Sequence, residues 1–159
     1  MKALIIYDSY FGNTETIAKA LQKELSNNGD AKAVKVQEAE KSMLEGIDLL
    51  LVGSPTRAFS PTKDISSFVK RLGSKQLENI RAGAFDTRVS TEEIDSKLLG
   101  IMVRVFGYAA KPIAKLLAKK GAEKPVQTKW FYVDDKEGPL KTGSIQLAIN
   151  WARELINKE

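Results

Sequence analysis

A short loop near the start of the chain has the residue types of a phosphate-binding site. The loop Ser9–Glu15 follows an apolar run, Ala3–Tyr7, and leads into a pattern with apolar residues on one helical face. In such a unit the loop amides and the first free N–H groups of the helix converge, and the helix dipole adds positive potential. Ser9 and Thr14 add hydroxyl donors, and Gly12 allows close backbone approach. The pattern predicts a site for a phosphorylated cofactor that needs no Lys or Arg.

Two later loops carry residues that suit the rest of a ligand. The loop 54–61 is stiffened by two prolines and contains Phe59, which either lies against a flat ligand or packs into the core. Arg57 offers a charged donor there, although an Arg on the surface is the ordinary case. The loop 86–91 supplies polar donors and acceptors, and its hydroxyl residues are also candidate N-caps for a following helix.

Two residue types are absent from the chain, which excludes several kinds of chemistry. Without Cys there are no disulfides, thiolate nucleophiles or Cys-ligated metals and clusters. Without His the chain lacks the usual general base and the commonest metal ligand. We therefore expect no catalytic side chain and no metal site.

Alternating strand and helix patterns must position the three loops. Apolar runs predict strands at 2–7, 31–36, 48–53, 82–85 and 126–133. Helical patterns cover 13–28, 42–45, 62–72, 94–120 and 142–157, with bends expected at Gly100, Gly107 and Pro112. Strands joined through helices are parallel with right-handed crossovers, so we expect one domain, 1–159, built as a three-layer α/β/α sandwich. Ligands of such sheets bind beyond the carboxyl ends of the strands, where the three loops lie.

The net charge of +5 is unevenly distributed. The segment 97–129 holds eight basic residues and a single acidic one, Glu123. This segment is either a solvated helix face or a docking surface for an acidic partner. No recognisable nucleic-acid-binding module accompanies it, so nucleic acid is not an expected partner.

Neither a signal peptide nor a membrane span is expected. Met1 and Lys2 lead directly into a short strand, and the longest apolar-looking stretch, 101–118, is interrupted by basic residues and a proline. We therefore expect a soluble cytoplasmic protein.

The sequence resembles the flavodoxin-like, FMN-binding proteins along essentially its whole length. Ser9–Glu15 is similar to the family's phosphate loop, commonly Ser/Thr-x-Thr-Gly-Asn-Thr-Glu, and stands in the same strand-to-helix context. Gly53–Thr56 resembles the second flavin loop and Ala84–Arg88 the third. The resemblance implies a flavodoxin-like, five-stranded parallel sheet in the order 2-1-3-4-5 and non-covalently bound FMN. The fifth strand has no long insertion, so the short-chain form is the better comparison.

The resemblance also implies which residues bind FMN. Around the phosphate it places Ser9, Tyr10, Phe11, Gly12, Asn13 and Thr14. Flanking the isoalloxazine ring it places Pro55, Thr56, Arg57, Ala58 and Phe59, together with Asp86, Thr87 and Arg88.

The chain departs from the family's pattern at several points. Phe11 stands where the family often has a hydroxyl, so one hydrogen bond to the phosphate is lost. The third loop lacks the aromatic residue that often stacks on the outer face of the flavin, which leaves Phe59 as the local candidate. The loop 55–61 has no Gly, so a backbone flip at Arg57-Ala58 would be costly. Electron-carrier flavodoxins are also usually acidic, whereas this chain is basic.

Two functions therefore stay open. The favoured one is electron transfer through FMN to a redox partner protein, for which an acidic surface would complement the basic segment. The alternative is an FMN-dependent NAD(P)H:quinone-type oxidoreductase. Such relatives are usually oligomers, and the stretch 101–108 is either a subunit interface or ordinary core. A phosphoacceptor receiver domain shares the topology but needs an Asp at the end of the third strand, where this chain has Gly53-Ser54.

Overall fold

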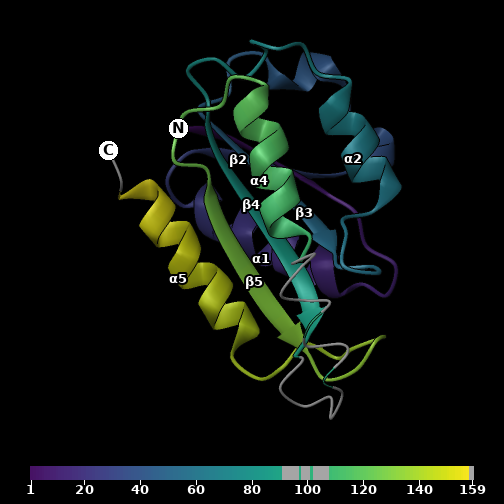
Figure 1. The fold of residues 1–159 in the computed structure, drawn as a ribbon. Helices are drawn as coiled ribbons and strands as arrows, with labels where there is room; N and C mark the ends of the chain where they lie inside the picture. Colours follow the sequence, from purple (N-terminus) through teal and green to yellow (C-terminus); the bar gives the residue numbers. More distant parts are fainter. Residues whose placement is uncertain (91–96, 98–100, 102–107, 158–159) are drawn as a thin grey trace.

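Five parallel strands form one sheet in the order β2-β1-β3-β4-β5 (Figure 1). This computed structural model describes residues 1–90, 97, 101 and 108–157. The strands are β1 (Lys2–Tyr7), β2 (Asp30–Lys35), β3 (Leu49–Pro55), β4 (Arg81–Val89) and β5 (Gln127–Val133). The predicted strand order is confirmed.

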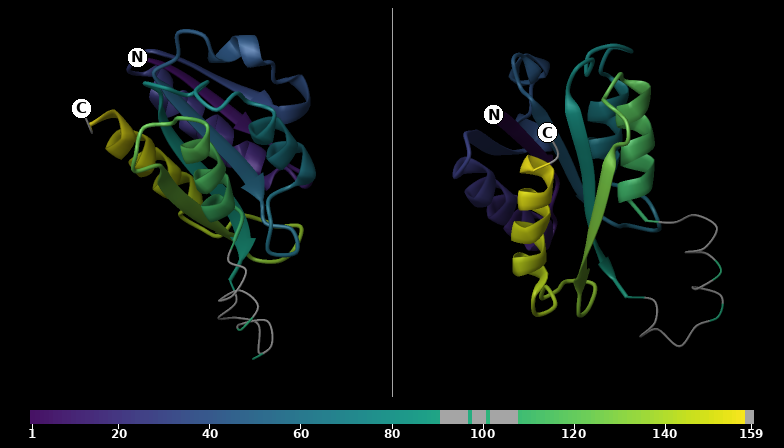
Figure 2. Two further views of the ribbon diagram at one scale, coloured as in Figure 1. Left: turned by 45° about the horizontal axis from the view of Figure 1, so that its top comes forward. Right: turned by 90° about the vertical axis from the view of Figure 1, so that its left-hand side faces the viewer.

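Helices cover both faces of the sheet and complete three layers (Figure 2). One face packs against α1 (Asn13–Ser26) and α5 (Ser144–Ile156), and the other against α2 (Lys63–Lys70) and α4 (Ala110–Lys119). Two short 3-10 helices, η1 (Val36–Glu38) and η2 (Lys41–Leu44), lie between β2 and β3. Within the described residues, no helix is both long and apolar enough to cross a membrane.

A separate apolar core fills each side of the sheet. On the α1 and α5 side, the ring of Phe85 is fully buried and meets Phe131 and Trp151 edge-on, with ring centres 6.3 and 6.2 Å apart. Gly53 is the register partner of Phe85 in β3, and a Cβ at this glycine would lie 2.1 Å from the Phe85 ring. The glycine at the end of the third strand is therefore required by the packing of a core aromatic.

β4 is longer than the sequence predicts. The expected strand is 82–85, whereas β4 continues to Val89. Asp86, Thr87 and Arg88 therefore lie within the strand and not in a loop after it, because each is paired in register with a residue of β5. Pairing with the neighbouring strand outweighs the polar composition that indicates a loop.

The predicted helix 94–120 is only partly described. Its last part is α4, and Pro112 lies in the first turn, where a missing N–H costs nothing, so it does not bend the helix. The other two expected bends, at Gly100 and Gly107, lie outside the described residues.

The loop after β3 ends in a two-residue turn with strained backbone. The N–H groups of Arg57 and Ser60 each donate to the carbonyl of the other residue, both at 2.9 Å. The central residues, Ala58 and Phe59, have φ angles of 44° and 65°. Turns of this kind favour Asn and Gly, because a side chain with a Cβ is crowded at positive φ. The glycine-free loop therefore has a strained tip.

Replacing Ala58 by Gly is expected to raise the free energy of unfolding by about 1 kcal/mol, because the substitution removes the Cβ from a left-handed position. The measurement is equilibrium unfolding in urea. The matched control is Asn79→Gly, at a φ of 64°, since Asn already tolerates this conformation and should gain less. An equal gain in both variants, or a loss in Ala58→Gly, would contradict the strain.

Candidate functional site

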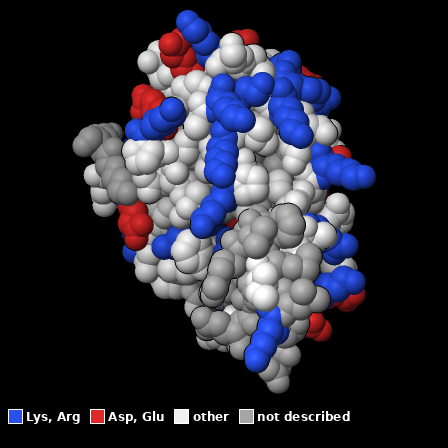
Figure 3. Space-filling view, in the orientation of Figure 1, with Lys and Arg blue, Asp and Glu red and all other residues white. Residues whose placement is uncertain are grey.

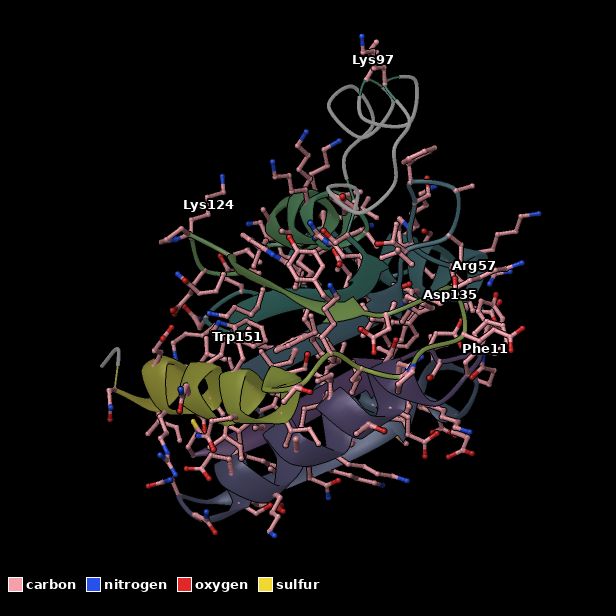
Figure 4. All side chains as sticks on the ribbon, turned by 90° about the horizontal axis from the view of Figure 1, so that it is seen from below. Phe11, Arg57, Lys97, Lys124, Asp135 and Trp151 are labelled. Atoms are coloured by element: carbon pink, nitrogen blue, oxygen red, sulfur yellow. The ribbon has the colours of Figure 1, made fainter. Side chains whose placement is uncertain are left out.

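The carboxyl ends of β1, β3, β4 and β5 border a cleft of about 360 Å³. It brings together most of the residues expected to bind FMN. Those that line it are Ser9, Tyr10, Phe11, Asn13, Thr14, Pro55, Thr56, Arg57, Ala58, Thr87 and Arg88. Figure 4 shows Phe11 and Arg57, which come from different loops, at the same end of the molecule.

Three of the expected residues do not line the cleft. Gly12 is the N-cap of α1 with a φ of 85°, and a Cβ there would meet nothing within 4 Å, so glycine is needed for the backbone conformation. Phe59 is half-buried in the strained turn. Asp86 is fully buried beneath the cleft, where it binds Arg88.

Three residues that line the cleft were not predicted to bind FMN, namely Val89, Val133 and Lys136. The first two end β4 and β5, and Lys136 belongs to the loop after β5. That loop reaches the phosphate loop, since Asn13 Nδ2 donates to the carbonyl of Glu137 at 3.0 Å. The predicted site takes its residues from the loops after the first, third and fourth strands, although a fifth parallel strand must end at the same edge.

Ser9 holds the phosphate loop in shape from within. Its Oγ accepts the N–H groups of Gly12 at 3.1 Å and Glu15 at 3.3 Å. A hydroxyl accepts two hydrogen bonds and donates one. Both acceptor positions of Ser9 are thus occupied, and its proton is left to donate to a ligand.

Four backbone N–H groups of the loop have no acceptor within the described part of the chain. They belong to Tyr10, Phe11, Asn13 and Thr14. The last two are the first residues of α1, where the helix dipole favours an anion. This donor set fits a phosphate group, because unpaired N–H groups and hydroxyls can surround its oxygens.

Two buried hydroxyls join the phosphate loop to β4. Thr14 Oγ1 and Thr87 Oγ1 lie 2.8 Å apart, and the two residues are 1% and 5% exposed. When Thr87 is the donor, the proton of Thr14 is free to point toward a ligand. The hydroxyl in β4 can therefore orient the one in the phosphate loop.

A buried ion pair fixes the third segment of the cleft. Arg88 donates to both carboxylate oxygens of Asp86, with Nε 2.6 Å from Oδ1, and the N–H of Ala110 donates to Oδ2 at 2.8 Å. Burial raises the pKa of Asp86, while Arg88 and the Ala110 N–H act against this rise. The guanidinium also lies 3.6 Å from the ring centre of Tyr108 and 5.1 Å from that of Trp130. Arg88 is thus a cation held in place at the cleft.

Within the described residues, no group of three or more acidic side chains gathers in a way that could hold a metal ion. The donors that face the cleft are hydroxyls, amides and cationic side chains, which suit anions.

Comparisons with known proteins agree with this geometry. The sequence model of the flavodoxin family matches residues 5–143. Flavodoxin 1 of Salmonella typhimurium strain LT2 is 44% identical over 52 residues, which are 33% of this chain and 29% of that protein.

Solved structures show the same fold. Oxidised flavodoxin 1 of Bacillus cereus is similar with a TM-score of 0.76 and 16% identity, over 100% of this chain and 99% of that one. The flavodoxin of Streptococcus pneumoniae TIGR4 has a TM-score of 0.72 and 19% identity, with 100% of both chains covered. Rubredoxin oxygen:oxidoreductase of Desulfovibrio gigas has a TM-score of 0.71 and 19% identity, over 96% of this chain and 34% of that one. Because the family's sequence model spans most of the chain, the protein belongs to the flavodoxin family of FMN-binding electron-transfer proteins.

Proposed function

We propose that this protein is a cytoplasmic electron carrier that binds FMN in the cleft and passes electrons to a redox partner protein. The observation that carries the proposal is the phosphate loop, in which four N–H groups have no acceptor within the described residues and two of the four belong to the first residues of α1. Bound FMN supplies the electron-transfer chemistry, and the chain binds and orients it. The cytoplasmic location rests on the sequence expectation.

The residues that line the cleft support a division of the site into two ends. At the phosphate end, the hydroxyls of Ser9 and Thr14 and the four N–H groups surround the phosphate oxygens. Phe11 brings no hydroxyl, but its N–H is one of the four, so the loss at this position is partial. At the ring end, Pro55, Thr56 and Ala58 flank the isoalloxazine together with the segment 87–89.

Apoprotein titrated with FMN should quench flavin fluorescence with a micromolar or lower Kd, and Thr14→Asp should weaken binding by at least about 100-fold. The reason is repulsion between the new carboxylate and the phosphate in a site of low effective dielectric. Thr16→Asp is the matched control, because it adds the same charge two residues further on at an exposed position outside the cleft lining.

Absence of FMN binding to the wild-type protein would refute the proposed function. Unchanged affinity in Thr14→Asp would show that the phosphate lies elsewhere.

Reduction by NAD(P)H is the second candidate function, and one feature favours it. Among the described residues, the lining of the cleft contains Arg57 and Lys136, which form no ion pair there, and no acidic residue, which suits the approach of an anionic dinucleotide. For an electron carrier we expect the oxidised flavin absorbance of the holoprotein to persist when NADPH is added without oxygen. Rapid loss of the oxidised flavin absorbance would instead indicate reduction by NADPH, the reductase activity.

The outer face of α4 supports an acidic partner. Lys111, Lys115 and Lys119 recur every fourth residue and are exposed, and within the described residues none forms an ion pair. Figure 3 shows a column of basic side chains over this helix. Such a surface attracts an acidic protein and steers its approach.

Replacing Lys111, Lys115 and Lys119 together by Glu should slow electron transfer from reduced holoprotein to ferricyanide, an anion, by about tenfold at low salt. Transfer to hexaammineruthenium(III), a cation, should become faster. The control is the triple Glu variant of Lys23, Lys32 and Lys41, which has the same net charge but places the change on α1, β2 and η2. Stopped-flow absorbance measures both rates. Equal effects in the two triple variants would exclude a specific role for α4.

A further inference from the structure

The cleft contains cationic side chains in addition to the phosphate loop, which itself has no Lys or Arg. Among the described residues that line the cleft, three are basic and none is acidic, and Arg88 is neutralised by Asp86. Within the described part of the chain, neither Arg57 nor Lys136 forms an ion pair. Within the described residues, two positive charges at the cleft are therefore left without an acidic partner.

Arg57 is held over the phosphate loop. Its guanidinium lies 4.9 Å from the ring centre of Tyr10 and 6.0 Å from that of Phe11. Tyr10 and Phe11 are 58% and 45% exposed, and both line the cleft. A guanidinium stacked on aromatic faces keeps its N–H groups, at the edge of its plane, available for an anion.

Lys136 lines the cleft from the loop after β5. This loop is joined to the phosphate loop by the hydrogen bond from Asn13 to Glu137. The contact is close, since a Cβ at Gly138 would lie 2.6 Å from the side chain of Asn13. In Figure 4, Asp135, the neighbour of Lys136, lies at the same end of the molecule as Arg57 and Phe11.

A buried carboxylate lies next to the phosphate loop, and the two cations can offset its effect on an anionic ligand. Asp8 is 5% exposed, and its Oδ1 accepts the N–H of Ser9 at 2.9 Å and the amide of Gln37 at 3.3 Å. Its Oδ2 is buried and has no hydrogen-bond partner within the described residues. A negative charge next to the loop opposes the binding of an anion there. Cations at the mouth of the cleft offset this effect.

We propose that Arg57, which the family resemblance places beside the ring, binds the FMN phosphate together with Lys136, and that the two cations add to the affinity provided by the loop. This inference rests on the proposed function. The hydroxyls and N–H groups of the loop set the position of the phosphate, and the two cations add charge-assisted contacts that a dephosphorylated flavin does not make.

The test is titration of the apoprotein with FMN and with riboflavin, followed by flavin fluorescence, between about 0.05 and 0.5 M NaCl. Arg57→Gln and Lys136→Gln should each lower the affinity for FMN by about tenfold and leave riboflavin binding unchanged. Arg57→Lys should keep part of the affinity, and the double Gln variant should lose most of the salt dependence. Lys63→Gln is the control, because it removes an exposed charge that does not line the cleft.

The outcomes separate the two proposals. Tight FMN binding that neither Gln variant weakens would overturn the phosphate contacts of Arg57 and Lys136 and leave the proposed function intact. Equal losses of FMN and riboflavin affinity in Arg57→Gln would place this side chain at the ring, which also overturns the inference. Absence of flavin binding to the wild-type protein would refute the proposed function itself.

Discussion

The four unpaired N–H groups of the phosphate loop are the constraint on which the rest of the site depends. β1 ends and α1 begins within a few residues, so this stretch of backbone has neither a ladder partner nor a preceding helical turn. Ser9 satisfies the N–H groups of Gly12 and Glu15, and the other four belong to residues that line the cleft. A dianionic phosphate meets this need better than a neutral ligand, because it also interacts favourably with the helix dipole.

Buried polar contacts connect this loop to the opposite wall of the cleft. The hydroxyl pair of Thr14 and Thr87 joins α1 to β4, and Asp86 joins Arg88 of β4 to the start of α4. Polar groups this deeply buried are costly unless paired, so the contacts hold the two walls in one arrangement. The extension of β4 that the sequence analysis missed is thus what positions Thr87 and Arg88 at the cleft.

Local patterns were enough to predict one wall of the site and not the other. The strand–loop–helix unit around Ser9–Glu15 depends on residues close in sequence, and the structure has this unit where it was expected. The end of β4 depends on pairing with β5, and the contribution of Lys136 depends on a contact between Asn13 and Glu137, 124 residues apart. The spacing of apolar residues along the sequence does not reveal contacts between residues so far apart in the chain. Phe59 is a different case. Its composition made it a candidate ligand contact, but its place in a tight turn keeps it out of the cleft lining.

The basic residues of the chain act in two different places, the cleft and the outer face of α4. Arg57 and Lys136 line the cleft, where their charges act directly on a bound ligand. The lysines of α4 are exposed on the outer face of a helix, where their charges act on a partner through solvent and are strongly screened. Net charge alone cannot distinguish these effects. Under the two proposals, a basic flavodoxin is compatible with electron transfer, because the first set offsets the charges of the phosphate and Asp8 and the second attracts an acidic partner.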